Sequence, residues 1–499
     1  MEELIRLVRL VQNYNSKLSP LINFQDSGNL DTRLFNLVRD AEVKTDEEAA
    51  YKLYGAKNLS ANYRMLKSRI KKKLINHVHF LELPESKFSP INLVKVQCAS
   101  MLFEVESLKS VSEFKLADKI LDQALTLAKE NEVNEYIVPI LEQKQWISNS
   151  LCDKKKYSQG IKKLEHYYVI ERAEREANKI FLDRTMNAKA FDGVRSKLLD
   201  NLPKDITKLE QLWTTTKSSR IFHYYHFFSI QYQELQGNYT AVADIISKAE
   251  ELVKQGVVHT NWFNYRFNSY AMVYAHLQTK QYGKGLQLAE QYLPHFHVGS
   301  INWFAFLENY LLLALHSKNY TLFYQKYRTA VDCNSILNLP VAHLERWEIF
   351  RRYCLVILTY RIKIDFVEKD YQAVSAFSVL PKDKEGYNIA ILVLDTFEQL
   401  SNPDIEDHEA NVERLRKYIS KYLRGPKAER ARLFLRFLIL VFKEDFNCQK
   451  IKSKGNKMFE KLSNTPLPGD AFSEVEIVPY EHLWELVIEI VEERSKTLA

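Results

Sequence analysis

Glycine and proline are both scarce in this chain. Each occurs 13 times in 499 residues, whereas average usage is about 7% and 5%. Because both residues disfavour helix interiors, their scarcity predicts a chain that is nearly all helix. The glycine-, serine- and histidine-based strings typical of nucleotide-binding loops, hydrolases and zinc proteases do not occur. We therefore expect no catalysis and no cofactor.

Cysteines and long apolar runs are also few. The five cysteines are odd in number and far apart, and no two form a Cys-x-x-Cys pair, which favours reduced, buried thiols in a cytosolic protein. No apolar run approaches the roughly 20 residues that span a membrane. Arg6 and Arg9 interrupt the first apolar segment, so we expect no signal peptide and a cytoplasmic location.

The abundant residues indicate a folded chain. Hydrophobic residues make up 46% and charged residues 27%, values typical of a globular protein. A formal charge of +7 permits an anionic partner without requiring one. Tyrosine and phenylalanine are numerous, at 28 and 27. At helical spacing such residues are mostly core, although some can line a binding groove.

The clearest local pattern is a helical hairpin centred on residues 236–239. Residues 222–235 read as one aromatic-rich helix, and residues 240–254 carry apolar residues at the spacing of an amphipathic helix. Gly237 can take the positive φ that closes the first helix. Tyr239 can wedge its ring between the two helices.

This unit recurs along the chain. An aromatic residue follows each predicted turn at intervals near 40 residues or about twice that. A small residue recurs three positions later and another ten positions later, which would let the second helix approach its neighbours closely. The aromatics are Phe114, Tyr157, Tyr239, Tyr282, Tyr320, Tyr371 and Phe446, and the small residues are Ala117, Gly160, Gly285, Ala124, Ala249 and Ala330.

The pattern resembles the tetratricopeptide repeat family, whose turn has a Gly-Asp/Asn-Tyr signature followed by alanine at those offsets. Residues 237–239 with Ala249 match best, and Phe114 with Ala117 and Ala124 come next. The period is longer than the family's 34 residues, and its opening Trp-x-x-Leu-Gly is mostly missing. The resemblance covers about 95–465. It implies a right-handed α-solenoid of helical hairpins whose first helices line a concave groove.

Three segments depart from the repeat. Residues 161–199 read as one or two unusually long helices ending near Pro203. Residues 401–411 read as an acidic loop. Residues 480–494 form an amphipathic helix that we expect to cap the array, with a wet face of Glu485, Glu489, Glu492, Glu493 and Arg494.

The N-terminal region reads as a small helical domain. Thr45 and Glu48 have capping-box spacing, Gly55 can end that helix, and Ser60 can cap the next one. The next helix runs from Ala61 to about residue 80, followed by a linker around Pro84 and Pro90. One face of this helix is predicted to be Tyr63, Leu66, Ile70, Leu74 and His77.

The other faces of that helix are strongly basic. Two helices joined by a short turn, the second basic, resemble a helix-turn-helix nucleic-acid module over residues 45–80. A solvated basic face is the ordinary alternative. The candidate nucleic-acid residues, within 60–74, are Arg64, Lys67, Arg69, Lys71, Lys72 and Lys73.

Candidate partner-binding residues come from two aromatic clusters that begin successive first helices, at 262–268 and 302–306. Their polar members could face a groove; the alternative is a helix buried all round with satisfied amides. These candidates are Asn264, Arg266, Asn268, Asn302 and Asn309. The pairs His223/His226 and His295/His297 lack the further ligands of a zinc site, so we expect no metal.

Together these patterns predict an all-α chain with three parts: an N-terminal helical domain at 1–90, tetratricopeptide-like repeats at 91–465, and a capping helix at 466–499. The favoured function is a non-catalytic scaffold or adaptor that binds a protein or peptide in the groove. The alternative is a nucleic-acid-associated regulator whose solenoid senses a partner, an arrangement known in bacterial regulators. A purely structural subunit would use the same surfaces. The sequence indicates neither the partner nor the oligomeric state.

Overall fold

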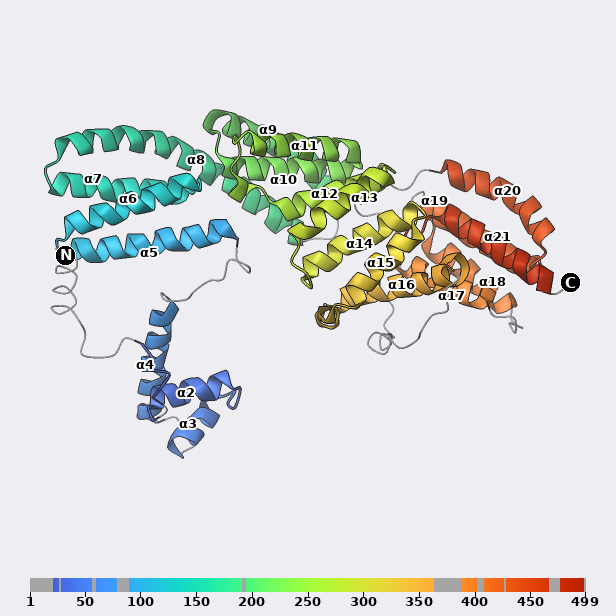
Figure 1. Ribbon diagram of the computed structural model, residues 1–499, viewed down its shortest axis with the longest axis horizontal. Coiled ribbons are helices and arrows are strands. Elements are labelled where there is room, and N and C mark those ends of the chain that lie inside the picture. The colour runs from blue at the N-terminus through green and yellow to red at the C-terminus, as the bar shows by residue number, and fades with distance from the viewer. Residues whose placement is uncertain are drawn as a thin grey trace. The chain divides into compact units, whose positions relative to one another are not determined.

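The computed structural model describes residues 21–26, 28–55, 60–78, 89–190, 194–362, 387–401, 408–425, 428–465 and 476–497. These residues form α-helices with a few short 3-10 and π segments, and no strand occurs among them (Figure 1). The chain is therefore all-α, as predicted. It divides into two compact units, Met1–Arg175 and Glu176–Ala499.

The first unit begins with three short helices, α2 (Leu30–Arg39), α3 (Asp46–Tyr54) and α4 (Ala61–Val78). They share a small core of their own, which includes Leu34 and Ala50. Thr45 and Glu48 form the predicted capping box at the start of α3, and Gly55 ends it in the left-handed conformation. The Ser60 hydroxyl accepts the backbone N–H of Tyr63, as a cap for α4 does.

Helix α4 carries most of its predicted apolar face into this core. Tyr63, Leu66 and Ile70 are buried, and His77 accepts a hydrogen bond from the backbone N–H of Ile22. Leu74 was predicted on the same face but is 39% exposed, because the core formed with α2 and α3 does not reach it. Residues 79 and 80, also predicted in this helix, lie outside the described residues.

The first unit continues with α5 (Pro90–Ser110), α6 (Phe114–Glu130), α7 (Asn134–Ser150) and the long α8 (Lys154–Ala190), which extends beyond residue 175. Helix α6 packs on both α5 and α7. Pro90 was predicted in a linker, but it is the first residue of α5, capped by Ser89. A proline is tolerated there because the first helical N–H has no intrahelical partner.

The second unit begins with a run of helices in which neighbours along the chain pack on one another. They are α9 (Val194–Thr216), α10 (Ser219–Gln236), α11 (Tyr239–Lys254), α12 (Tyr265–Gln278), α13 (Tyr282–Tyr292), α14 (Ile301–His316), α15 (Tyr320–Val331) and α16 (Val341–Ile357). Short 3-10 segments at Thr260–Trp262, Leu293–His295 and Asn334–Asn338 join some of them, and a π segment, Leu358–Ile362, follows α16. In Figure 1 these helices run from green to yellow.

The sequence predicted that a long helix ends near Pro203. This prediction is wrong, because α9 continues through Pro203 to Thr216. The proline removes one backbone hydrogen bond. Leu202 and Leu209 on either side of it are fully buried, and α9 packs along α10. Tertiary burial of the helix therefore outweighs the local preference of the proline.

Several turns between the helices share a residue in the left-handed backbone conformation. Gly237, predicted to take a positive φ, has a φ of 74° and ends α10. Ser112, Lys280 and Lys318 take the same left-handed conformation two residues before their following helices. The turns before α7, α8 and α10 use Glu132, Cys152 and Lys217 in the same way. Most of these turns thus place a non-glycine residue where glycine is strongly favoured.

The aromatic that follows the turn is the first residue of its helix in four cases: Phe114, Tyr239, Tyr282 and Tyr320. Tyr239 is buried, and its ring meets the ring of Tyr274 of α12 edge-on at 5.5 Å. The remaining predicted aromatics differ. Tyr157 is the fourth residue of α8, Phe446 precedes a later helix, and Tyr371 lies outside the described residues.

The last described helices are α17 (Tyr387–Ser401), α18 (His408–Tyr422), α19 (Glu429–Lys443), α20 (Cys448–Asn464) and α21 (Tyr480–Thr497). Residues 402–407 of the predicted acidic loop lie outside the described residues, and 408–411 begin α18. The predicted wet face of α21 is partly engaged, because Glu485 pairs with Lys318 and Glu489 with Arg361.

Buried polar contacts hold α21 to α19 and α14. Arg430 of α19 donates to the Glu476 carboxylate at 2.6 Å and to Glu481 at 2.6 Å. The His316 Nε2 atom at the end of α14 lies 2.7 Å from the Glu476 carbonyl oxygen. Because Arg430 and Glu476 are each at most 5% exposed, removing one would leave the other as an uncompensated buried charge.

Candidate partner-binding site

The structure separates the five predicted partner-binding residues into two groups. Asn264 and Arg266 are exposed at the start of α12, and Asn302 is exposed at the start of α14. The Asn264 side chain accepts the backbone N–H of Phe267 at 3.1 Å and so caps its own helix. Asn268 and Asn309 are 2% and 4% exposed and lie within the helix packing.

Asn268 is a core amide, the alternative that the sequence left open. Its Oδ1 atom lies 2.6 Å from His226 Nε2, and its Nδ2 atom donates to the Asn264 carbonyl at 2.9 Å. Burial lowers the pKa of His226 to about 4, so the ring is neutral and donates from Nε2 to the amide oxygen. This pair joins α10 to α12, and both polar atoms of the Asn268 amide make a hydrogen bond within the helix packing.

A different set of polar side chains converges across α10, α12, α14 and α16. The hydroxyl of Tyr270 has Glu308, Arg346 and Glu234 as electrostatic neighbours, and Tyr274 also has Glu234. We call this set the polar stripe. It consists of Glu234, Tyr270, Tyr274, Glu308, Asn309, His343 and Arg346.

Glu308 lies near the middle of the stripe and is 7% exposed. Its Oε2 atom is 3.2 Å from Arg346 Nη1, whereas Oε1 is 3.8 Å from His343 Nδ1 and makes no hydrogen bond. Burial raises the pKa of Glu308 to about 7, although Arg346 and Trp347 oppose the increase. The Arg346 ion pair therefore does not fully compensate for the burial of this carboxyl.

Glu234 is the second carboxyl of the stripe, in the last turn of α10. It is partly exposed, and burial among its neighbours raises its pKa to about 7. Among the described residues, no hydrogen bond or ion pair satisfies this carboxyl.

The tyrosines give the stripe an accessible aromatic surface. Tyr270 is 40% exposed, while burial of its surroundings raises the pKa of its hydroxyl. Burial also raises the pKa of Tyr274 to about 12. Both hydroxyls are thus neutral near pH 7 and can donate or accept hydrogen bonds.

Sequence reasoning missed most of this stripe, although two signals were present. Arg266, Tyr270 and Tyr274 recur at four-residue spacing and so share one face of α12, but only the first was selected. Glu308 is an acid within the otherwise apolar stretch of α14. Which face of each helix meets the next could not be read from either signal.

The basic residues of α4 are largely engaged within the chain. Lys67 Nζ lies 2.7 Å from the Asp46 carboxylate of α3. Arg69 and Lys73 lie 2.9 and 2.8 Å from Asp31 of α2. Burial would raise the pKa of Asp31, but hydrogen bonds from these two cations lower it.

Three of the six predicted nucleic-acid residues therefore neutralise carboxylates of the same bundle. Lys71 and Lys72 are exposed and make no ion pair among the described residues, and Arg64 is exposed as well. Binding of nucleic acid by α4 stays a prediction. Lys71 and Lys72 alone present less charge to a phosphate backbone than the full stripe would.

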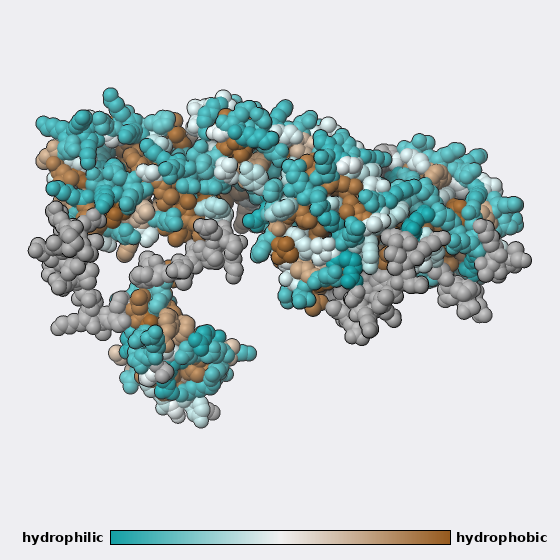
Figure 2. Space-filling model, viewed as in Figure 1, coloured by the Kyte–Doolittle hydropathy of each residue, from teal (hydrophilic) through white to brown (hydrophobic). Residues whose placement is uncertain are grey.

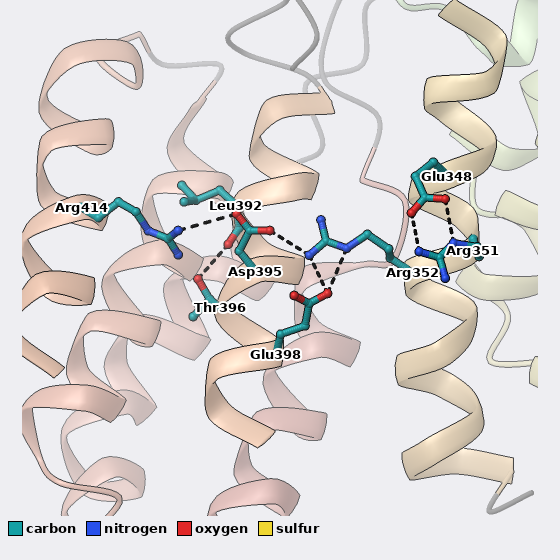
Figure 3. A network of polar contacts seen from close by, with 8 residues as sticks. All are labelled: Glu348, Arg351, Arg352, Leu392, Asp395, Thr396, Glu398 and Arg414. Carbon is teal, nitrogen blue, oxygen red and sulfur yellow. Dashed lines mark hydrogen bonds and ion pairs between the residues drawn. The ribbon is translucent and has the colours of Figure 1, made fainter. Parts of the chain in front are cut away.

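Another polar network connects α16, α17 and α18 (Figure 3). Arg352 Nη2 lies 2.8 Å from Asp395 and 2.7 Å from Glu398, and Arg414 approaches Asp395 at 3.6 Å. Two cations meet two carboxylates, so the charges balance within the network. It joins the three helices, and each of these four charged groups has an oppositely charged neighbour.

The described part of the chain shows neither a metal-binding group nor a membrane-spanning helix. No group of three or more His, Cys, Asp or Glu side chains is placed there to hold a metal ion. No described helix combines the length and apolarity needed to cross a membrane, and hydrophobic residues are interspersed with hydrophilic ones on the face shown in Figure 2. The sequence matches no protein-family model and no curated protein.

Proposed function

We propose that this chain is a non-catalytic scaffold or adaptor that binds a protein or peptide segment, and that its polar stripe is the binding surface. The proposal includes the expected architecture: helices α5–α21 form a right-handed solenoid of tetratricopeptide-like hairpins, preceded by the small basic bundle. The recurrent left-handed turn residues and the small residues buried on second helices, such as Ala117 and Ala249, support that architecture.

One observation carries the binding proposal. Alternate helices α10, α12, α14 and α16 bring together polar groups that the described structure leaves incompletely satisfied. Glu308 Oε1 and Asn309 Nδ2 are buried without hydrogen-bond partners, and buried polar groups are otherwise paired in the great majority of cases. A bound peptide would supply donors and acceptors to the exposed part of the stripe, where Tyr270 is 40% exposed. Arg266 lies on the same face of α12 and extends the stripe toward the start of that helix.

The test uses the full chain and a phage-displayed library of random 12-residue peptides. Enriched peptides are synthesised with a photoreactive residue, and crosslinks are mapped by mass spectrometry. We expect crosslinks on α10, α12, α14 and α16. Crosslinks confined to other helices, or no enrichment over display background, would show that the stripe is not a peptide-binding surface.

A matched pair of variants tests the same point in solution. Tyr270→Ala should weaken binding of the enriched peptides, because Tyr270 is 40% exposed within the stripe. Tyr265→Ala is the control, since this tyrosine lies on the same helix, is 41% exposed and is not part of the stripe. Equal effects of the two substitutions on peptide affinity would contradict the proposal.

A further inference from the structure

A pocket of about 430 Å³ lies between α20 and α21, two helices that contribute no residue to the polar stripe. The helices pack side by side near the end of the chain (Figure 1). The volume falls within the range of roughly 300–1,000 Å³ that is usual for ligand pockets. The less exposed part of its lining carries no polar side chain and consists of Ile451, Gly455, Phe459, Trp484 and Ile488.

Gly455 keeps the centre of this pocket clear. The indole of Trp484 stacks on the Phe437 ring of α19, with ring centroids 3.4 Å apart and ring planes at 10°. A Cβ atom at position 455 would lie 3.2 Å from Trp484 Cζ2, so any larger side chain there would crowd the indole. Glycine disfavours helix interiors, and this close approach accounts for its place in the middle of α20.

The charged residues of the pocket are already paired. Three of them line it, and each has a partner of opposite charge outside the lining. The pairs are Lys452 with Glu492, Glu485 with Lys318, and Glu489 with Arg361. The pocket therefore offers no uncompensated charge, and its apolar surface favours an uncharged group.

The exposed edge of the pocket keeps hydrogen-bonding capacity. Glu485 and Glu489 lie one turn apart on α21, and their side chains are 45% and 46% exposed. Lys318 and Arg361 donate to Oε2 of these carboxylates, so Oε1 of each can accept a further hydrogen bond. Asn456 is exposed on the α20 side, and among the described residues no hydrogen bond engages its side-chain amide. A hydrocarbon alone would leave these groups unused, whereas a peptide brings backbone N–H and C=O groups beside an apolar side chain.

We propose that this pocket docks a partner protein through one large apolar side chain of the size of leucine or phenylalanine. The side chain packs against Trp484, and the backbone on either side of it bonds to Glu485, Glu489 and Asn456. This surface is separate from the polar stripe, so the inference goes beyond the proposed function.

The experiment fills the pocket and asks which peptides are lost. A phage-displayed library of random 12-residue peptides is selected in parallel on the full-length wild-type chain, on Asn456→Trp and on Asn464→Trp. Asn456 is exposed, so a tryptophan there adds a ring to the pocket without removing a packed side chain. Asn464→Trp is the matched control, because Asn464 is exposed on the same helix and does not line the pocket.

We expect one group of peptides that is enriched on wild type and Asn464→Trp, is missing on Asn456→Trp, and shares a large apolar residue at one position. Replacing that residue with alanine should weaken binding to wild type about tenfold or more, as expected when a large apolar side chain is no longer buried. Methylating the backbone nitrogens beside it should also weaken binding. Peptides that bind the polar stripe should instead depend on Tyr270 and bind Asn456→Trp like wild type.

Two results would overturn the inference and leave the polar stripe untouched. In the first, no group of peptides is lost on Asn456→Trp, or the lost group has no shared apolar position. In the second, methylation of the backbone nitrogens leaves the affinity unchanged, which would show that the pocket takes an apolar group without contacting a peptide backbone.

Discussion

Glu308→Gln is the substitution for which the structure makes the sharpest prediction. The side chain is 7% exposed, and burial raises the pKa of its carboxyl from the ordinary 4.5 to about 7. Each pKa unit corresponds to 1.36 kcal/mol, so a difference of about 2.5 amounts to ~3 kcal/mol. Glutamine has nearly the same shape and does not titrate.

The sign follows from proton linkage. Between pH 4.5 and 7 the folded chain holds the Glu308 proton more tightly than the unfolded chain, so stability falls as the pH rises. The contribution of Glu308 is fully present below pH 4.5 and is lost as the pH passes 7. The free energy of unfolding of Glu308→Gln relative to wild type should therefore increase by ~3 kcal/mol between pH 4.5 and pH 8.

Native-state hydrogen exchange of α14 amides is the suitable assay, because unfolding of a 499-residue chain with two compact units is not a single transition. Amides of α5–α7, in the other unit, should not respond. Glu290→Gln is a control of opposite sign, since hydrogen bonds from Lys326 and Tyr310 lower the pKa of Glu290. Its stabilisation is present above the unfolded pKa, so this variant should lose stability at pH 8.

Refutation would take a specific form. If the stability of Glu308→Gln depends on pH as strongly as that of wild type, burial does not disfavour the ionised form of the Glu308 carboxyl. If the variant loses stability between pH 4.5 and pH 8 relative to wild type, the ion pair with Arg346 outweighs burial.

The remaining predictions concern two helix contacts and one turn. Gly285→Ala should destabilise the α13–α14 contact by ~1–3 kcal/mol, because a Cβ there would lie 2.8 Å from a Leu313 methyl group. Gly283→Ala is the control, because Gly283 lies in the same helix with open space around it, and this substitution should stabilise the protein by ~0.5–1 kcal/mol. Equal effects of the two substitutions in thermal melts would contradict this packing. Asn268→Ala should cost ~1–3 kcal/mol by leaving His226 unpaired, and weakened peptide binding at unchanged stability would show a direct binding role instead. Lys280→Gly should raise the stability of the α12–α13 hairpin by ~1 kcal/mol, because Lys280 has a φ of 59°; a loss in chemical denaturation would refute the turn argument.

Some of the architecture follows from local chemistry and was predictable. The capping box at Thr45 and the left-handed ends at Gly55 and Gly237 appear as expected. These features depend only on residues within one turn of a helix end, so sequence patterns report them directly. Scarcity of glycine and proline likewise predicted an all-helical chain, because helix propensity sums over long segments.

Other boundaries were decided by packing. Glu132, Cys152 and Lys217 adopt the left-handed turn conformation at a cost of roughly 1–2 kcal/mol each, which burial of the flanking helices offsets. No residue type marks these turns, so the sequence did not identify Glu132, Cys152 and Lys217 as turn residues. Pro203 shows the converse, because a strong local signal for a helix end was overridden by the packing of α9 on α10.

The candidate site depended most on tertiary structure. Asn268 and Arg266 are two residues apart on one helix, yet one is a core amide bonded to His226 and the other is exposed. Glu234 and Glu308 are 74 positions apart in the sequence, and both are electrostatic neighbours of the Tyr270 hydroxyl. Helical periodicity determines which residues share a face of one helix. Only the packing of α10, α12, α14 and α16 decides which faces meet, because that choice sums many weak contacts between residues far apart in the chain.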